Sequence, residues 1–389
     1  MTLEDKEKYD RVKSKIRDAG LDALLVKLPE NVLYFSNWWP ITGWGAALVF
    51  AEQDPILFAP DTETLFAKRR IIDDLREYQP NGNKSLVNEL KKTDASKKRL
   101  KIGVEKSFES VAGTHLGYEL AVPNNPLFSL VGKEMPKWDL EDAIPLINEI
   151  RAVKSKMDFE NLKLVNEVNA YGLKAAAEAL KEEKTEMEIA TLCEATINNK
   201  INDMGDKIDF VRAFSFVMGG PENGSRACWP YNISSDYKMK KGELCMMELN
   251  TQVNGYWSDI TRTWVVGRNP SEEQENMMNT INTAIQKAIN ACEPGTATKD
   301  VDKASREHIM STKWGKYHTP FLGHGIGVKL HESIPMLTPD SPGTVEEGHY
   351  FTIEPGIYGK EIKGALRIER DVWIGPNGPE ITDLFPCEL

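Results

Sequence analysis

Residues 247–263 read MELNTQVNGYWSDITRT and contain two acids, one on each side of an Asn-Gly pair. Asn-Gly is the strongest short signal for a β-hairpin, because both residues tolerate the positive φ that a tight turn requires. Aromatic and apolar residues flank the pair, so we expect strands over 243–249 and 256–266. The segment therefore predicts an antiparallel hairpin with its turn at the Asn-Gly pair.

This hairpin would bring its two carboxylates together. With the turn centred on the Asn-Gly pair, Asp259 faces Asn250, and Glu248 lies two residues from Asn250 on the same face. The two acids then become diagonal neighbours, roughly 5–8 Å apart at Cβ. A metal ion can bridge that separation. The alternative is a solvated strand face with two unrelated acids, although the apolar flanks make this a poor surface strand.

Three further segments of the C-terminal half contain residues of metal-ligand type. They are GHGIGVKLHES (323–333), TIEPGIY (352–358) and RIERD (367–371), with the candidates His324, His331, Glu354, Arg367 and Glu369. Oxygen ligands with one imidazole suit hard divalent ions. A cage for two such ions, which can activate water for hydrolysis, would consist of Glu248, Asp259, His324, Glu354 and Glu369.

The glycines around the first histidine bear on its geometry. His324 and His331 are seven positions apart, so a straight strand would point them to opposite faces. The glycines between them permit the backbone to bend, so that both imidazoles can address one cavity. We expect one to bind metal and the other to donate a hydrogen bond to substrate. Taken singly, each could equally be an ordinary core or surface histidine.

The last two acids are candidates for burial, because Glu354 and Glu369 have apolar neighbours in the sequence. A buried carboxylate requires a cation or strong hydrogen bonds. The alternative for Glu369 is an ion pair with Arg367 or Arg370.

The composition excludes several classes of protein. At 389 residues, the chain is long enough for two domains. It has no apolar run of about 18 residues, which argues against a membrane span, and its net charge of −11 argues against general nucleic-acid binding. Five scattered cysteines without CxxC spacing are typical of reduced thiols. The charged N-terminus lacks a signal peptide's apolar core, so we expect a cytoplasmic location.

The order of the patterns predicts two domains. Residues 1–150 alternate helical and extended segments, which indicates an α/β domain with a mixed sheet. Residues 151–389 combine longer helical segments with apolar extended ones, which indicates an α+β domain. Within the first domain, short strands are expected at 21–26, 31–36, 46–51 and 55–60.

With these motifs the chain resembles the pita-bread metallopeptidases, the family of methionine aminopeptidase, proline aminopeptidase and prolidase. The resemblance covers nearly the whole chain and is strongest to the proline-specific and creatinase-like branch. It implies a creatinase-type N-terminal domain over 1–150 and a pita-bread catalytic domain over 151–389. It also implies that Asp259, His324, Glu354 and Glu369 are metal ligands, that His331 faces the substrate, and that Arg367 matches a family arginine.

The chain departs from the family pattern at two positions. Glu248, in Glu-Leu-Asn, stands where the family has an aspartate in a DAG-like context. Its extra methylene moves the carboxylate by about 1.5 Å, so one metal site could be displaced, weakened or lost. Tyr231 stands where the family has a histidine that assists the scissile bond. A tyrosine can donate a hydrogen bond there, but it is no imidazolium near neutral pH.

The resemblance implies a metal-dependent hydrolase that uses a metal-activated water on the peptide bond preceding proline. The cofactor would be divalent ions, two by the pattern, drawn from manganese, cobalt, iron and zinc. Glu354 would be both a ligand and a proton shuttle, His331 would steady the oxyanion or the substrate carboxylate, and Arg367 would bind substrate or support the ligands. The substrate would be an Xaa-Pro dipeptide or a short peptide, and the chain would form a homodimer.

Two other functions stay open. A non-peptidase of this fold could act on a small C–N or C–S compound, as creatinase, ectoine hydrolase and dimethylsulfoniopropionate lyase do. The aromatic cluster of Trp38, Trp39 and Trp44 could then bind an ammonium or sulfonium group by cation–π attraction, although ordinary core or dimer packing is the favoured explanation. A catalytically inactive binding module is the third hypothesis, against which the retained ligands argue.

Overall fold

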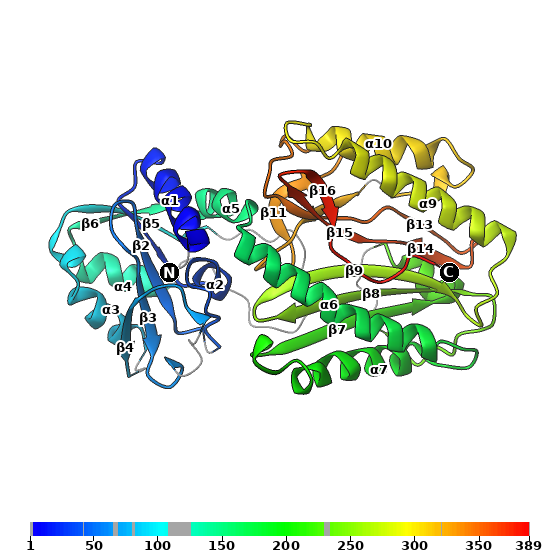
Figure 1. Ribbon diagram of the computed structural model, residues 1–389, viewed down its shortest axis with the longest axis horizontal. Helices are drawn as coiled ribbons and strands as arrows, with labels where there is room; N and C mark the ends of the chain where they lie inside the picture. The colour runs from blue at the N-terminus through cyan, green and yellow to red at the C-terminus, as the bar shows by residue number, and fades with distance from the viewer. Residues whose placement is uncertain are drawn as a thin grey trace. The chain divides into compact units, whose positions relative to one another are not determined.

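The computed structural model describes residues 3–41, 43–64, 69–79, 82–107, 126–228, 234–319 and 321–388. The chain divides into two compact units (Figure 1). The first comprises residues 1–151 and 155–157, and the second comprises 152–154 and 158–389.

A six-stranded sheet forms the centre of the first unit. Its strand order is β4-β3-β2-β1-β5-β6, and it is mixed, because β2 is antiparallel to both its neighbours and the other pairs are parallel. The strands are β1 (Ala23–Val26), β2 (Ala46–Phe50), β3 (Ile56–Pro60), β4 (Asp74–Tyr78), β5 (Leu100–Val104) and β6 (Trp138–Asp142). The helices are α1 (Leu3–Asp18), α2 (Pro29–Ser36), α3 (Asn83–Lys91), α4 (Pro126–Glu134) and α5 (Ile144–Ala152). The mixed sheet is as predicted.

One predicted strand of this unit is wrong. Residues 31–36 lie in helix α2, which begins at Pro29. Proline suits the first turn of a helix, since its φ is already helical and its missing N–H would have no partner there. All six residues are buried. Their sequence therefore lacks the alternation of polar and apolar positions that would distinguish a helix from a strand.

The second unit is built from three sheets and four long helices. The sheets have the orders β7-β8-β9, β11-β10-β12-β15-β16 and β13-β14. The strands are β7 (Val211–Gly219), β8 (Leu244–Val253), β9 (Tyr256–Val265), β10 (Gly323–Gly325), β11 (Glu332–Leu337), β12 (Tyr350–Ile353), β13 (Gly356–Gly359), β14 (Gly364–Arg367), β15 (Arg370–Gly375) and β16 (Gly378–Ile381). The helices are α6 (Lys156–Ala179), α7 (Glu186–Asn198), α9 (Glu272–Ala291), α10 (Thr298–Met310) and the short α8 (Gly220–Asn223).

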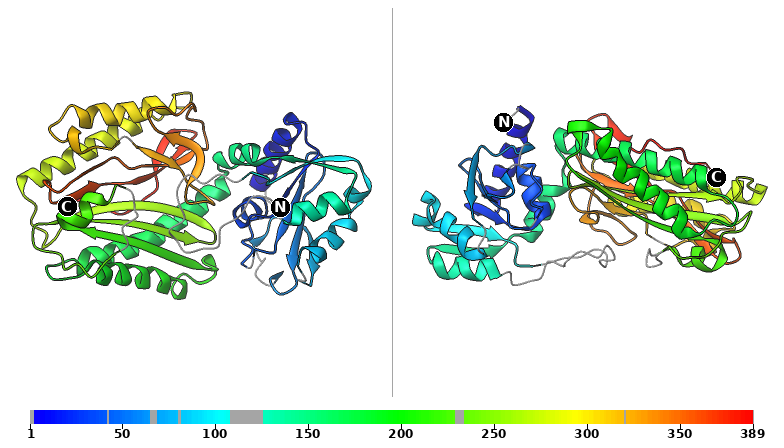
Figure 2. Two further views of the ribbon diagram at one scale, coloured as in Figure 1. Left: turned by 180° about the vertical axis from the view of Figure 1, so that it is seen from behind. Right: turned by 90° about the horizontal axis from the view of Figure 1, so that it is seen from below.

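The long helices lie outside these strands, in two groups (Figure 1, Figure 2). Helices α6 and α7 pack on β7–β9 through one apolar cluster, and α9 and α10 pack on β12, β14 and β15 through another. Alternate residues of a strand point to opposite faces. Since Leu249 and Ile260 belong to the first cluster, and Ile353 and Leu366 to the second, their sequence neighbours face away from the helices.

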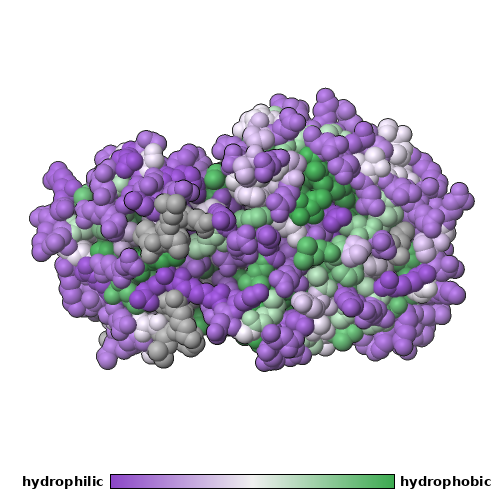
Figure 3. Space-filling model, viewed as in Figure 1, coloured by the Kyte–Doolittle hydropathy of each residue, from purple (hydrophilic) through white to green (hydrophobic). Residues whose placement is uncertain are grey.

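The visible face of the molecule is mainly hydrophilic (Figure 3). Hydrophilic side chains cover most of the face shown in Figure 3, with smaller apolar areas between them. Among the described residues, no helix is both long and apolar enough to cross a membrane.

The predicted hairpin is confirmed, with β8 and β9 paired in the expected register. Val253 pairs with Tyr256, and Asn250 pairs with Asp259. The two turn residues, Asn254 and Gly255, have φ of 53° and 92°. Both values lie in the left-handed region that a type I′ turn requires. Strand β8 continues four residues beyond the predicted end at Leu249.

We predict that Gly255→Ala destabilises the second unit by about 1–2 kcal/mol, because an alanine at positive φ brings Cβ too close to the following carbonyl oxygen. Urea denaturation followed by tryptophan fluorescence measures the change. Gly343→Ala is the matched control, because Gly343 lacks a positive φ and its added Cβ would meet only Thr298, at 3.7 Å. Equal losses for the two variants would contradict the turn assignment.

Candidate metal centre

The β8–β9 hairpin contributes two buried acids on the face opposite the helices. Glu248 and Asp259 are each 3% exposed. Asn250 Nδ2 donates a hydrogen bond of 2.6 Å to Asp259 Oδ1. The other oxygen of Asp259, Oδ2, lies 3.7 Å from His324 Nε2. One oxygen of Asp259 is thus bound within the hairpin, and the other faces the histidine.

His324 is held on β10 with one ring nitrogen directed at the acids. Its Nδ1 lies 2.9 Å from the carbonyl oxygen of Gly325. Because a carbonyl can only accept, Nδ1 carries the proton and Nε2 keeps its lone pair, as a metal ligand requires. The glycines on either side are obligatory, since a Cβ at Gly323 would lie 2.0 Å from Thr352 O and one at Gly325 would lie 2.3 Å from Ile334 O.

The bend expected beside His324 is present. The pairing of β10 with β11 shifts register between His324 and Gly325. The ring centroids of His324 and His331 are 4.2 Å apart. The two histidines therefore do address one region, as the glycine pattern predicts, and His331 is the more exposed of the pair.

Glu354 follows β12 and meets three groups. Its Oε1 accepts a hydrogen bond of 3.0 Å from the hydroxyl of Thr352 and lies 3.5 Å from His324 Nε2. Its Oε2 lies 3.8 Å from a guanidinium nitrogen of Arg367. The Thr352 hydroxyl also accepts the backbone N–H of His324, at 3.1 Å. Thr352 therefore fixes the histidine and the glutamate relative to each other.

Glu369 has one satisfied oxygen and one that has no hydrogen-bond partner. Its Oε2 accepts a hydrogen bond of 2.7 Å from the Thr261 hydroxyl. Its Oε1 is buried without such a partner, and the residue is 1% exposed. A buried carboxylate oxygen is costly without a donor or a cation. Its position next to the other acids fits a metal ligand better than the alternative, an ion pair with a neighbouring arginine.

Glu248 has a different partner. Its carboxylate forms an ion pair and hydrogen bond with Arg367, and both side chains are 4% exposed. Arg367 Nε also donates to the Thr261 hydroxyl at 2.9 Å. The Arg367 guanidinium thus contacts both Glu248 and Thr261, whose hydroxyl binds Glu369.

Two sets of side chains have ligand atoms within 4.8 Å of one another among the described residues. One is Asp259, His324 and His331, and the other is His324, Glu354 and Glu369. Four of the five predicted ligands therefore lie together, with His331 added. Glu248 belongs to neither set. The donors are carboxylate oxygens and imidazole nitrogens, which fit a divalent transition-metal ion.

Burial raises the pKa of the acids in the cage. Burial is the largest cause for Asp259, Glu354 and Glu369, and repulsion by neighbouring carboxylates raises the pKa of each further. Attraction to Arg367 opposes these effects. The acids therefore hold protons more tightly than exposed carboxyls do, unless a cation is present.

A small pocket beside Glu354 contains residues that the motifs do not indicate. It is lined by Cys228, Thr319, Phe321, Glu354, Tyr358 and Arg367. Burial raises the pKa of the Tyr358 phenol, so this side chain is neutral near pH 7. Tyr358 lies four positions after Glu354, but a tyrosine in a strand is too common to be singled out by sequence. Tyr231, the residue in place of the family's histidine, lies outside the described residues.

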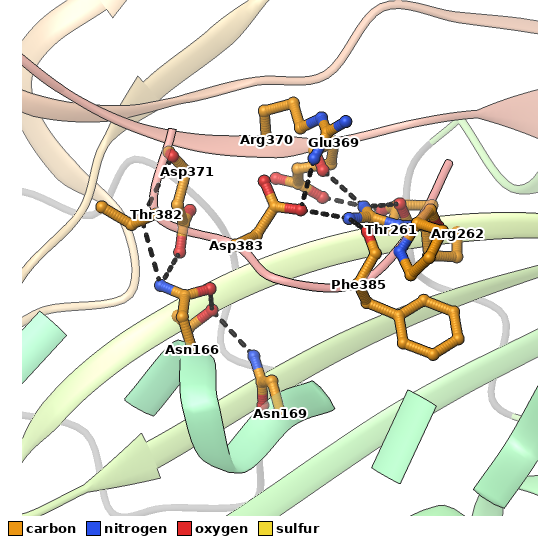
Figure 4. A network of polar contacts seen from close by, with 12 residues as sticks. Asn166, Asn169, Thr261, Arg262, Glu369, Arg370, Asp371, Thr382, Asp383 and Phe385 are labelled. Carbon is orange, nitrogen blue, oxygen red and sulfur yellow. Dashed lines mark hydrogen bonds and ion pairs between the residues drawn. The ribbon is translucent and has the colours of Figure 1, made fainter. Parts of the chain in front are cut away.

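A polar network lies behind the cage and ties it to the rest of the unit (Figure 4). The fully buried Arg262 donates to the backbone carbonyl of Glu369 at 2.7 Å and forms an ion pair with Asp383. Asn166 of α6 donates to Asp371 at 3.0 Å, and burial raises the pKa of Asp371 to about 8. These contacts hold β9, β15 and the C-terminal segment together.

The tryptophan cluster lies in the first unit. Trp38 is 3% exposed, and a Cβ at Gly45 would lie 2.7 Å from its ring. The ring of Trp44 has Lys27 Nζ 5.9 Å from its centroid. Core packing therefore accounts for Trp38. A cation-binding role for Trp39 and Trp44 stays a prediction.

Comparison with known proteins identifies the family. Residues 160–376 match the model of metallopeptidase family M24, and residues 8–153 match that of the creatinase/prolidase N-terminal domain. The chain belongs to metallopeptidase family M24. The family is metal-dependent, and the ligand sets of this M24 chain fit that chemistry.

Relatives of the M24 chain match over nearly its whole length. An Xaa-Pro dipeptidase of Pyrococcus furiosus is 30% identical over 377 residues, which cover 96% of each chain. The solved prolidase of Pyrococcus horikoshii OT3 is 26% identical with a TM-score of 0.77, covering 98% of this chain and 99% of that one. An X-Pro aminopeptidase of Thermotoga maritima is 25% identical with a TM-score of 0.78, covering 96% and 99%. The expected family and fold, with a creatinase-type domain before a pita-bread domain, are confirmed.

We predict that the metal-free protein loses stability as pH rises and that metal restores it. A carboxyl with a raised pKa binds its proton more tightly in the folded state, so its contribution is complete below about pH 4 and is lost as pH rises through the folded pKa. A divalent cation replaces these protons. Melting temperatures are measured from pH 5 to pH 8 in EDTA and in Mn²⁺. The rise in melting temperature that Mn²⁺ causes, here called the metal increment, should grow with pH.

The control for this prediction removes the charges. The double variant Glu354→Gln/Glu369→Gln should lose most of the metal increment and part of the pH dependence, while Asp371 still titrates. A metal increment that is the same at every pH would contradict the prediction.

Proposed function

We propose that this M24 chain is a metal-dependent hydrolase that cleaves the peptide bond preceding proline in Xaa-Pro dipeptides or short peptides. The observation that carries the proposal is the buried set of His324, Glu354 and Glu369, whose ligand atoms lie within 4.8 Å of one another. The names of the relatives, Xaa-Pro dipeptidase and prolidase, support the choice of substrate.

The proposed ligands are Asp259, His324, Glu354 and Glu369. Their oxygen-rich donor set favours manganese, cobalt or iron, and also accommodates zinc. When bound, the divalent ion supplies Lewis acidity and lowers the pKa of a water that attacks the scissile carbonyl.

The chain's own residues would divide the proton transfers and the binding of charge. Glu354 has a raised pKa and is held between His324 and Arg367, which suits a group that takes a proton from water and passes it to the leaving amine. His331, whose ring lies next to that of His324 and is partly exposed, would donate to the developing oxyanion or to the substrate carboxylate. Tyr231 would add a further hydrogen bond.

Aromatic side chains beside Glu354 would contact the proline ring of the substrate. Phe321 and Tyr358 place aromatic rings in the lining of the small pocket, next to the proposed proton shuttle. Aromatic walls provide apolar contact for a pyrrolidine ring, and binding sites generally combine such walls with a few polar groups.

The second candidate is a non-peptidase that acts on a small C–N or C–S compound. The observation in its favour is the pairing of Glu248 with Arg367, which engages the residue at the family's first ligand position. A site altered there could serve different chemistry on the same fold.

We predict that the metal-loaded enzyme hydrolyses Met-Pro at least tenfold faster, in kcat/KM, than Met-Ala. Ninhydrin assays or chromatography of the released amino acids measure both rates, with creatine and dimethylsulfoniopropionate tested in parallel. Turnover of either of these without any hydrolysis of Met-Pro would overturn the proposal in favour of the second candidate. No turnover of any compound would favour the binding module.

We further predict that His331→Ala lowers kcat/KM for Met-Pro by about 10²–10⁴-fold, the range for removal of a group that assists proton transfer or charge stabilisation. The matched control is His308→Ala in the last turn of α10, a residue that belongs to neither ligand set, which should stay within twofold of the unmodified enzyme. A similar small effect at both positions would exclude His331 from the reaction.

A further inference from the structure

The number of ions depends on which ligand atoms are available. Paired ions lie roughly 3.5–4 Å apart and share ligands, so a two-ion cage needs carboxylates that present both oxygens. The five-residue pattern meets this need only if Glu248 and both oxygens of Asp259 are open to metal. Among the described residues, Glu248 Oε2 is paired with Arg367, and Asp259 Oδ1 is bound by Asn250.

Glu248 is engaged by a fixed cation. Its carboxylate is paired with Arg367, and both side chains are buried. A guanidinium does not lose its proton in proteins, so the positive charge persists at every working pH. Arg367 is also anchored, because its backbone N–H donates to the Thr263 hydroxyl at 3.1 Å and its Nε donates to Thr261. An ion at Glu248 would have to displace or adjoin this charge.

Asp259 is engaged by an amide. Asn250 faces it in the hairpin register, and its Nδ2 donates to Oδ1 at 2.6 Å. An N–H group cannot bind a cation. Both residues are buried, so bulk water does not compete with this hydrogen bond.

The remaining ligand atoms form one site. Both ligand sets contain His324, and its Nδ1 is used by the carbonyl of Gly325. Only Nε2 is left, and one nitrogen lone pair binds one ion. The two sets are therefore alternative descriptions of a single position, which the unpartnered Glu369 Oε1 also borders.

We propose that the cage holds one divalent ion per chain, at the His324 end, and that Glu248 with Arg367 and Asn250 with Asp259 exclude the second. This is one ion fewer than the sequence pattern predicts. The inference rests on the metal dependence in the proposed function and adds the stoichiometry and the residues that set it. Glu248 and Asn250 are here residues that determine metal occupancy, not catalytic residues.

Metal counting tests this without any assay of activity. The full chain is stripped with EDTA, incubated with excess Mn²⁺ and desalted, and bound manganese is measured by mass spectrometry. Electron paramagnetic resonance then distinguishes isolated Mn²⁺ from a spin-coupled pair. We expect one ion per chain with the signal of isolated Mn²⁺. Two coupled ions in the unmodified protein would overturn the inference but leave the proposed function intact, whereas no bound ion would overturn both.

Variants test the residues responsible. In the double variant Glu248→Asp/Asn250→Gly, the shorter carboxylate is withdrawn from Arg367 and the amide is removed. This variant should bind two Mn²⁺ ions and give the resonance signal of a spin-coupled pair. Glu243→Asp is the matched control, because Glu243 accepts a hydrogen bond from Tyr237 just before β8 and lies outside both ligand sets; it should keep one ion. One ion in a folded double variant would refute the role of these pairs. If that variant does not fold, Asn250→Ala tests the amide alone, and an unchanged Mn²⁺ affinity would refute its role.

Discussion

Mutual repulsion among buried carboxylates is the constraint around which the second unit is organised. Asp259, Glu354 and Glu369 face one another away from water, and burial raises the pKa of each. Each acid is consequently given donors: an amide for Asp259, and hydroxyls of Thr352 and Thr261 for the two glutamates. A divalent cation would neutralise the negative charge that remains on these carboxylates. Folding of the unit and binding of metal are therefore coupled through the same groups.

The strands make this arrangement possible because of their alternation. One sequence neighbour of each acid belongs to an apolar cluster under the helices, namely Ile260, Ile353 and Ile368, and the acids therefore point inward from both halves of the unit. Positions on paired strands are held more precisely than positions on loops. His324 extends this principle to a short strand, where glycines allow close approach of the backbone and the Gly325 carbonyl sets the tautomer.

Glu248 shows how one substitution changes the distribution of charge. Its carboxylate meets Arg367, which also approaches Glu354 and is linked through Thr261 to Glu369. A permanent cation thus takes part of the neutralising role that a second ion would have. The same hairpin supplies the amide of Asn250 opposite Asp259. Glu248, which departs from the family pattern, and Asn250 therefore act on adjacent parts of one site.

The sequence by itself determined the hairpin and its register, and it indicated four of the side chains that lie together in the candidate metal centre. An Asn-Gly turn dictates which residues pair, and spacing along a strand dictates which face they share. It did not separate the buried helix at 31–36 from a strand, since residues buried on all sides show no period. Tyr358, Cys228, Thr352 and the Glu248–Arg367 pair were likewise decided only by the tertiary structure. Glu248 and Arg367 lie on strands more than a hundred residues apart, Thr352 contacts His324 on another strand, and Tyr358 and Cys228 lie in a pocket. No local pattern encodes which distant side chain a carboxylate will meet.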